Sequence, residues 1–290
     1  MNPAPSVIIF TVLSGLGFGF LALLATGVVG VSGWTAFGTW GLGYGFAIAG
    51  LLASTAHLGN PQRALLAFSQ WRSSWLSREA WASVATLLAL APMALSDWLG
   101  LGLPRGIGWV AAALCLVTIL CTSMIYAQIK AVPRWHHWTT PAVFLTFSLT
   151  GASILAGEKP AATGLCVVLL ILLAVAFRLG DRQFARAGST IGSATGLGRI
   201  GAVTVFELPH TGENYLMREM IHVVGRRHAA KLRQLALLFL ALPVPVLWVL
   251  PMPVASAIAV VLHLTGAFIV RWLFFAQAEH VVGLYYGARA

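Results

Sequence analysis

Residues 7–30 read VIIFTVLSGLGFGFLALLATGVVG and contain no charged side chain. A helix needs about 20 apolar residues to cross the hydrocarbon core of a bilayer, and this run is longer than that. In lipid the backbone must satisfy its own hydrogen bonds, which an uninterrupted apolar run does as an α-helix. The stretch therefore predicts a transmembrane helix, and its glycines allow neighbouring helices to approach closely.

The rest of the chain repeats this pattern. Of its 290 residues, 59% are hydrophobic and 9% are charged, whereas soluble domains carry roughly 25% charged residues. We expect an all-α membrane protein, folded as one polytopic domain over residues 1–290 with eight transmembrane helices in a bundle. The expected spans are residues 7–30, 36–56, 80–97, 107–130, 141–157, 160–179, 233–250 and 254–280.

The 18 Lys and Arg residues indicate how the spans are oriented. The loops 57–78, 130–139 and 178–233 and the C-terminus hold 3, 2, 9 and 1 of them, whereas the other side holds only Arg105 and Lys159. Because cytoplasmic loops carry the excess of basic residues, both termini and these three loops are predicted to be cytoplasmic. The positive charge thus reports topology and a docking face, and we expect no nucleic-acid partner.

The long loop 178–233 ends in a basic segment with helical spacing. We expect an amphipathic cytoplasmic extension that precedes the seventh span and faces either anionic lipid or a partner protein. Its apolar side is formed by Leu216, Met220, Val223 and Val224, and its charged side chains are Arg218, Glu219, Arg226 and Arg227.

The loop between the second and third spans concentrates ionisable groups. Residues 57–79 read HLGNPQRALLAFSQWRSSWLSRE, with His57 leaving one span and Glu79 entering the next. Ionisable groups at the edge of a span are costly, so function is the first hypothesis for them. Ser77 is placed to cap the third helix, which puts Glu79 in its first turn, where the helix dipole favours the carboxylate and desolvation favours the acid. Glu79 and His57 are therefore candidates for proton exchange near neutral pH.

Proton exchange at two points suits a quinone, whose two carbonyl oxygens gain or lose protons as two electrons arrive or leave. The alternative for Glu79 is an ion pair with a nearby arginine, and for His57 a simple interfacial histidine. Trp71 and Trp75 also fit an aromatic belt at the membrane surface. Arg271, expected in the last span with Glu279 and His280, also fits a structural ion pair. The predicted quinone site comprises His57, Arg63, Trp75, Ser77, Glu79 and, as a weaker candidate, Arg271.

A resident redox centre is not expected in this chain. Two histidines on facing helices can ligate a b-type haem, but only His263 lies deep in a span. Cys115, Cys121 and Cys166 lie in apolar runs without CxxC spacing, so they suggest neither disulfides nor a metal site. We expect no haem and no metal, and hence a redox partner for any quinone reaction.

HLGNPQRA and WLSRE, together with TGENYLMREM and RRHAAKLR in the long loop, resemble the membrane-anchor subunit of dimethyl sulfoxide reductases and of related sulfite-oxidising molybdoenzymes. The resemblance covers essentially the whole chain. It implies a bacterial inner-membrane complex of three subunits: a molybdopterin catalytic subunit, an iron-sulfur electron-transfer subunit and this haem-free anchor, which binds menaquinone or ubiquinone. In that family the histidine and glutamate after the second span are associated with the quinone site, and they match His57 and Glu79.

The orientation helps to choose among the functions that this resemblance implies. A cytoplasmic docking face favours sulfite oxidation with quinone as the acceptor over a dimethyl sulfoxide reductase anchor that oxidises quinol. A secondary transporter is an alternative from another class, but transporters commonly carry polar residues at the midplane, whereas here they gather at one face. A passive scaffold is a third alternative, which would leave Glu79 unexplained.

Overall fold

The computed structural model describes residues 1–56, 60–204, 206–207, 212, 214, 216–217, 220 and 228–286, and within them every regular element is a helix. Eight helices are long and apolar enough to cross a membrane, which confirms the predicted fold class. They are α1 (Pro5–Thr26), α2 (Gly33–Thr55), α3 (Trp75–Leu99), α4 (Arg105–Ala127), α5 (Thr139–Ala156), α6 (Lys159–Arg186), α9 (Ala229–Ala241) continued by α10 (Pro243–Val249), and α11 (Val254–Ala276).

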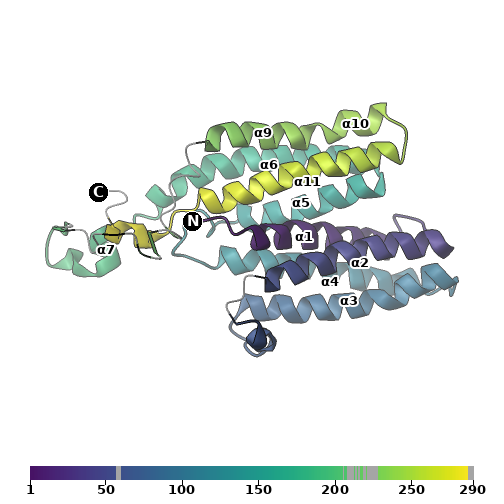
Figure 1. The fold of residues 1–290 in the computed structure, drawn as a ribbon, viewed down its shortest axis with the longest axis horizontal. Coiled ribbons are helices and arrows are strands. Elements are labelled where there is room, and N and C mark those ends of the chain that lie inside the picture. The colour runs from purple at the N-terminus through teal and green to yellow at the C-terminus, as the bar shows by residue number, and fades with distance from the viewer. Residues whose placement is uncertain are drawn as a thin grey trace.

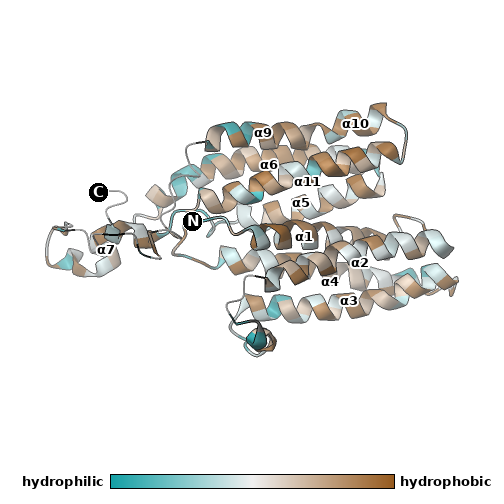
Figure 2. Ribbon diagram, in the orientation of Figure 1, coloured by the Kyte–Doolittle hydropathy of each residue, from teal (hydrophilic) through white to brown (hydrophobic). Residues whose placement is uncertain are grey.

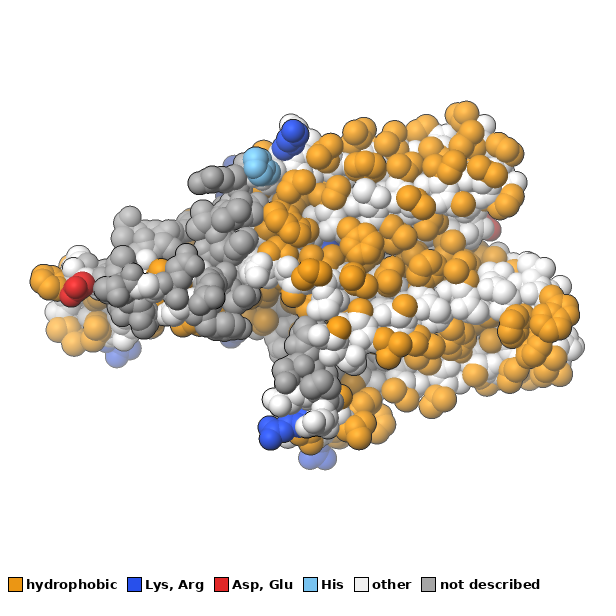
Figure 3. All heavy atoms as spheres, viewed as in Figure 1, with side chains coloured by type: hydrophobic (Ala, Val, Ile, Leu, Met, Phe, Trp, Pro, Cys, Tyr) orange, Lys and Arg blue, Asp and Glu red, His pale blue; other side chains and the backbone are white. Residues whose placement is uncertain are grey.

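The spans run side by side along the long axis of the molecule (Figure 1). Helices α1 to α4 form one half of the bundle, and α5, α6, α9, α10 and α11 form the other. In Figure 2 hydrophobic residues, coloured brown, occur along the whole length of the spans. Lys and Arg side chains gather in Figure 3 at the end that carries α7 (Ile191–Thr195) and the loop after α2, which is also the end of the N-terminus.

Helix α1 lies at the junction of the two halves. It is the most enclosed span, since 78% of the residues in its 18-residue apolar stretch are buried. Its glycines explain how the neighbouring helices come so close. A Cβ on Gly17 would collide with the backbone of Ala47 in α2, and one on Gly19 would lie 2.5 Å from the Ser148 carbonyl oxygen in α5. In lipid the hydrophobic effect does not drive helices together. Small residues let the helices approach closely, and the resulting van der Waals packing stabilises their association.

Several boundaries differ from the sequence prediction. Helix α3 begins at Trp75 and α6 continues to Arg186, because the polar residues beyond 179 prolong the helix out of the apolar zone. The seventh span is divided at Pro243, which lacks the N–H that a continuous helix requires. Helix α11 ends at Ala276, so the expectation that Glu279 and His280 belong to the last span was wrong. Most of the expected amphipathic extension lies outside the described residues.

A buried polar cluster joins three helices at the opposite end of the bundle. Asp97 in α3 accepts hydrogen bonds from Arg105 Nη2 at 2.6 Å and Nη1 at 3.2 Å, and from Trp40 Nε1 at 3.1 Å. The Asp97 side chain is only 6% exposed, whereas that of Arg105 is 40% exposed. This cluster satisfies a carboxylate that would otherwise be buried without a partner.

Candidate functional site

Glu79 lies in the second turn of α3. The helix begins at Trp75 with Ser74 as its N-cap residue, so the expectation that Ser77 caps the helix was wrong. Ser77 is buried, and its hydroxyl accepts a 3.3 Å hydrogen bond from the backbone N–H of Gln70, which fixes the preceding loop instead. Because the effect of the helix dipole fades beyond the first turn, hydrogen bonding and burial dominate the environment of Glu79.

Glu79 is a buried residue, 4% exposed, and its carboxyl group contacts α4. Thr122 Oγ1 donates a 2.6 Å hydrogen bond to Glu79 Oε1, and the same hydroxyl lies 3.1 Å from the Thr118 carbonyl oxygen. Among the described residues, no basic side chain forms an ion pair with Glu79. Its neighbour Arg78 instead donates to the carbonyl oxygens of Trp71 and Arg72 at 3.0 and 2.7 Å.

A cavity of about 620 Å³ opens beside Glu79. This volume lies within the range of about 300–1,000 Å³ that is usual for small-molecule sites. Most of its wall is apolar, and Glu79 is the carboxyl group that the wall presents. The lining residues come from segments far apart in the sequence: Met1, Val7, Phe10, Leu51, Ser54, Thr55, Ala64, Leu65, Ala67, Phe68, Leu76, Glu79, Ala80, Ser83, Val84, Ile125, Tyr126, Ile129, Trp135 and Phe275.

The loop after α2 covers one side of this cavity with a short 3₁₀ helix, η1 (Pro61–Phe68). Phe68 anchors it, since the Trp81 indole N–H of α3 donates to the Phe68 carbonyl oxygen at 3.0 Å and the two rings meet edge to face at 5.3 Å. The sequence prediction considered the polar residues and the tryptophans of this loop and missed its other apolar residues. The run ALLAF, residues 64–68, could have indicated this role, since apolar residues in a short polar loop usually pack over an apolar surface.

The structure brings one of the predicted site residues to the cavity, namely Glu79. Arg63 is exposed and Trp75 packs beneath the Arg78 guanidinium, 4.4 Å from its ring centroid, and neither lines the cavity. His57 lies outside the described residues, although Ser54 and Thr55 just before it are lining residues. Arg271 lines a different cavity.

Tyr126 is a lining residue that the sequence prediction missed. It is buried at the end of α4, and its ring packs edge to face on Phe274 and Phe275 and tilted against Phe144, at centroid distances of 5.4 to 5.8 Å. A tyrosine near the end of an apolar run normally indicates an interfacial belt. Only the packing of α11 and α5 around it reveals that this hydroxyl-bearing side chain faces the interior.

No group of three His, Cys, Asp or Glu side chains that could hold a metal ion occurs in the described part of the chain. His263 is buried in α11 with its ring centroid 5.7 Å from that of Phe147, and its Nδ1 has no hydrogen-bond partner among the described residues. The three cysteines are buried as free thiols in α4 and α6. The hydroxyl and carboxyl groups of the residues that line the Glu79 cavity belong to Ser54, Thr55, Glu79, Ser83 and Tyr126.

Comparison with known proteins gives two matches over nearly the whole chain. The model of the DMSO reductase anchor subunit family (DmsC) matches residues 1–287. A sulfite dehydrogenase subunit of Allochromatium vinosum, the one designated C, is 32% identical over 99% of this chain and 99% of that protein. No solved structure matches.

Proposed function

Because the chain belongs to the DMSO reductase anchor subunit family, we propose that it binds a quinone in the cavity at Glu79 and links a redox partner to the quinone pool. The observation that carries this proposal is one buried carboxyl group in the wall of an apolar cavity of about 620 Å³. An isoprenoid quinone has matching chemistry, since its apolar body bears two carbonyl oxygens that take up one proton each when the ring accepts two electrons.

Thr122 allows Glu79 to hold or release a proton without rearrangement of the backbone. When Glu79 is a carboxylate, the Thr122 hydroxyl donates to Oε1 at 2.6 Å. When Glu79 is protonated, the same hydroxyl can accept from it and turn its own proton to the Thr118 carbonyl oxygen, 3.1 Å away. A hydroxyl group donates one hydrogen bond and accepts others, so it satisfies both states. Glu79 is thus suited to donate a proton to a quinone oxygen at the cavity wall.

His57 is proposed as the second proton donor, on the grounds of the sequence, because the cavity is lined by the residues that end α2. Hydroxyl and carboxyl groups exchange protons but no electrons, and we propose that the electrons come from partner subunits, as membership of an anchor-subunit family suggests. We infer an iron-sulfur subunit in contact with the basic end of the bundle, and a molybdopterin subunit beyond it. We propose that this end faces the cytoplasm, on the grounds of its Lys and Arg residues, and that the complex lies in the bacterial inner membrane.

Sulfite oxidation with quinone as the acceptor is the proposed overall reaction. The relative at 32% identity belongs to a sulfite dehydrogenase, and the cytoplasmic docking face agrees with that activity. The family description favours the second candidate, a DMSO reductase anchor that oxidises quinol. Both candidates use the same cavity, but electrons flow to quinone in the first and from quinol in the second. The reaction of the catalytic subunit determines which applies.

The test is Glu79→Gln in the assembled complex. Loss of general acid–base catalysis should reduce quinone-linked turnover by about 100-fold, while turnover with a soluble dye that accepts electrons from the partner subunits should persist. Glu158→Gln, at the opposite end of the bundle, is the matched control and should leave both activities unchanged. Equal loss of quinone and dye activity in the Glu79 variant would contradict the proton role.

A further inference from the structure

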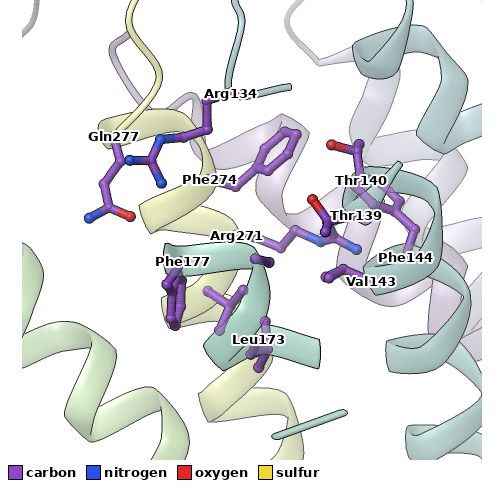
Figure 4. Close-up of a pocket in the computed structure, with 12 residues that line it drawn as sticks. Arg134, Thr139, Thr140, Val143, Phe144, Leu173, Phe177, Arg271, Phe274 and Gln277 are labelled. Carbon is purple, nitrogen blue, oxygen red and sulfur yellow. The ribbon is translucent and has the colours of Figure 1, made fainter. Parts of the chain in front are cut away.

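A second cavity, of about 60 Å³, lies between α5, α6 and α11 (Figure 4). One water needs about 10–15 Å³ of such space, so this cavity has room for a larger polar group. Phe274 lines it, whereas Tyr126 and Phe275 line the Glu79 cavity, and the contacts among these three rings separate the two spaces.

Arg271 occupies the middle of this cavity (Figure 4). Its side chain is 3% exposed, and its guanidinium carbon lies 3.4 Å from the centroid of the Phe144 ring. Among the described residues no carboxylate pairs with it, and its Nη1 has no hydrogen-bond partner. Because arginine stays protonated in proteins, a buried guanidinium without an anion is costly. An anion at Arg271 would therefore offset the cost of burying this charge.

The rim of the cavity adds further donors. Arg134 and Gln277 lie together beyond Arg271 in Figure 4. Arg134 Nη2 donates to Asp181 Oδ1 at 2.5 Å, and the same oxygen accepts from Arg233 Nη2 at 2.6 Å. Burial lowers the pKa of Arg134, while Asp181 and, more weakly, Glu279 oppose this shift. Arg134, Arg233 and Arg271 thus outnumber the two carboxylates, and the region retains positive charge.

Thr139 and Thr140 add two hydroxyl-bearing side chains to the wall. Val143, Leu173, Phe177 and Val270 make much of the rest apolar, and the Phe177 ring lies 4.8 Å from the guanidinium carbon of Arg233. Helix α6, which supplies two of these residues, is mostly uncovered, with Val167 and Ile171 exposed on its outer surface. Cationic and amide donors beside apolar walls, next to an uncovered surface of α6, suit an anionic amphiphile that arrives from the bilayer.

We propose that this cavity binds the phosphate group of an anionic phospholipid, with its oxygens at Arg271 and Gln277 and its acyl chains along α6. Basic pockets between transmembrane helices near the cytoplasmic surface bind such headgroups in other membrane proteins. Free inorganic phosphate shares the anionic chemistry but gains nothing from the apolar wall. The site is separate from the Glu79 cavity and does not depend on the quinone proposal.

The experiment titrates the delipidated, detergent-purified complex with phosphatidylglycerol, phosphatidylcholine or inorganic phosphate, and counts bound molecules by native mass spectrometry. One phosphatidylglycerol should bind per chain, and Arg271→Gln should weaken it about tenfold or more, as expected for a lost charge-assisted hydrogen bond. Arg72→Gln is the matched control, because this exposed arginine places its guanidinium over the Trp71 ring, at 5.3 Å, and should leave binding unchanged.

Gln277→Met keeps the approximate size of the side chain and removes an amide donor from the rim. It should weaken the binding of phosphatidylglycerol severalfold, and it tests the site if Arg271→Gln fails to assemble. Equal binding of phosphatidylglycerol and phosphatidylcholine, or wild-type affinity in every variant that assembles, would overturn the proposal. Saturable binding of inorganic phosphate without selectivity for phosphatidylglycerol would overturn the lipid as the source of the phosphate.

Discussion

Thr122 in α4 donates a 2.6 Å hydrogen bond to Glu79 in α3, and this contact bridges 43 positions of the sequence. It joins the ends of two neighbouring spans directly at the wall of the larger cavity. Since Thr122 can also turn to the Thr118 carbonyl oxygen, the pair accommodates the carboxylate and the acid alike. Four measurements test this site and the packing that forms it.

Thr122→Val should reduce quinone-linked turnover by about 10- to 150-fold, because the loss of one hydrogen bond to a charged group is worth about 1.5–3 kcal/mol. Thr122→Ser keeps the hydroxyl group and should restore most of the activity. Thr118→Val is the matched control, since it removes the hydroxyl pair with Thr86 but keeps the Thr118 carbonyl oxygen. Steady-state assays with quinone and with dye distinguish the outcomes; similar losses in the valine and serine variants would show that packing, and not the hydroxyl, matters.

Ala80→Phe should raise the KM for quinone by about tenfold while kcat changes little, because Ala80 lines the cavity and the larger ring occupies space that the substrate needs. Ala85→Phe, on the exposed side of the same helix, is the control and should leave KM unchanged. Quinone titrations with the assembled complex provide the measurement. An unchanged KM in the Ala80 variant would place the quinone elsewhere.

Gly50→Ala should destabilise the bundle by about 1–3 kcal/mol, as overpacking does in a close-packed interior. A Cβ at this position would overlap the backbone of Ser14 in α1, which cannot withdraw as a flexible side chain would. Gly45 lies on the same helix with no atom within 4 Å of an added Cβ, so Gly45→Ala should be neutral or slightly stabilising. Thermal unfolding in detergent compares the two, and equal melting temperatures would contradict the proposed role of the α1–α2 contact.

Asp97→Ala should lower the stability by about 1–3 kcal/mol, because it leaves the buried Trp40 indole N–H without its acceptor. Arg105→Gln should also cost about 1–3 kcal/mol, because it removes the cation from a carboxylate that is only 6% exposed. Quinone-linked turnover should be normal in both variants, because the cluster lies at the end of the bundle opposite the Glu79 cavity. A loss of turnover greater than the loss of folded protein would instead connect the two ends.

The amino-acid sequence by itself determined the eight spans, because crossing a bilayer requires only about 20 consecutive apolar residues, which is a local property. It also marked Glu79 as a candidate, since a carboxyl group at the start of an apolar helix stands out without knowledge of its neighbours. The distribution of Lys and Arg predicted which loops share one face, and Figure 3 shows these side chains at one end of the bundle.

Tertiary structure alone decided what surrounds that carboxyl group. Thr122, Tyr126 and Phe275 reach the Glu79 site through the packing of α4 and α11, and no local pattern distinguishes them from other residues of an apolar span. It likewise placed Arg271 in a cavity of its own, apart from Glu79. A span is specified by its own residues and the bilayer, whereas a cavity is specified by which helices pack together, a choice made by small residues such as Gly17 and Gly50 at the helix contacts.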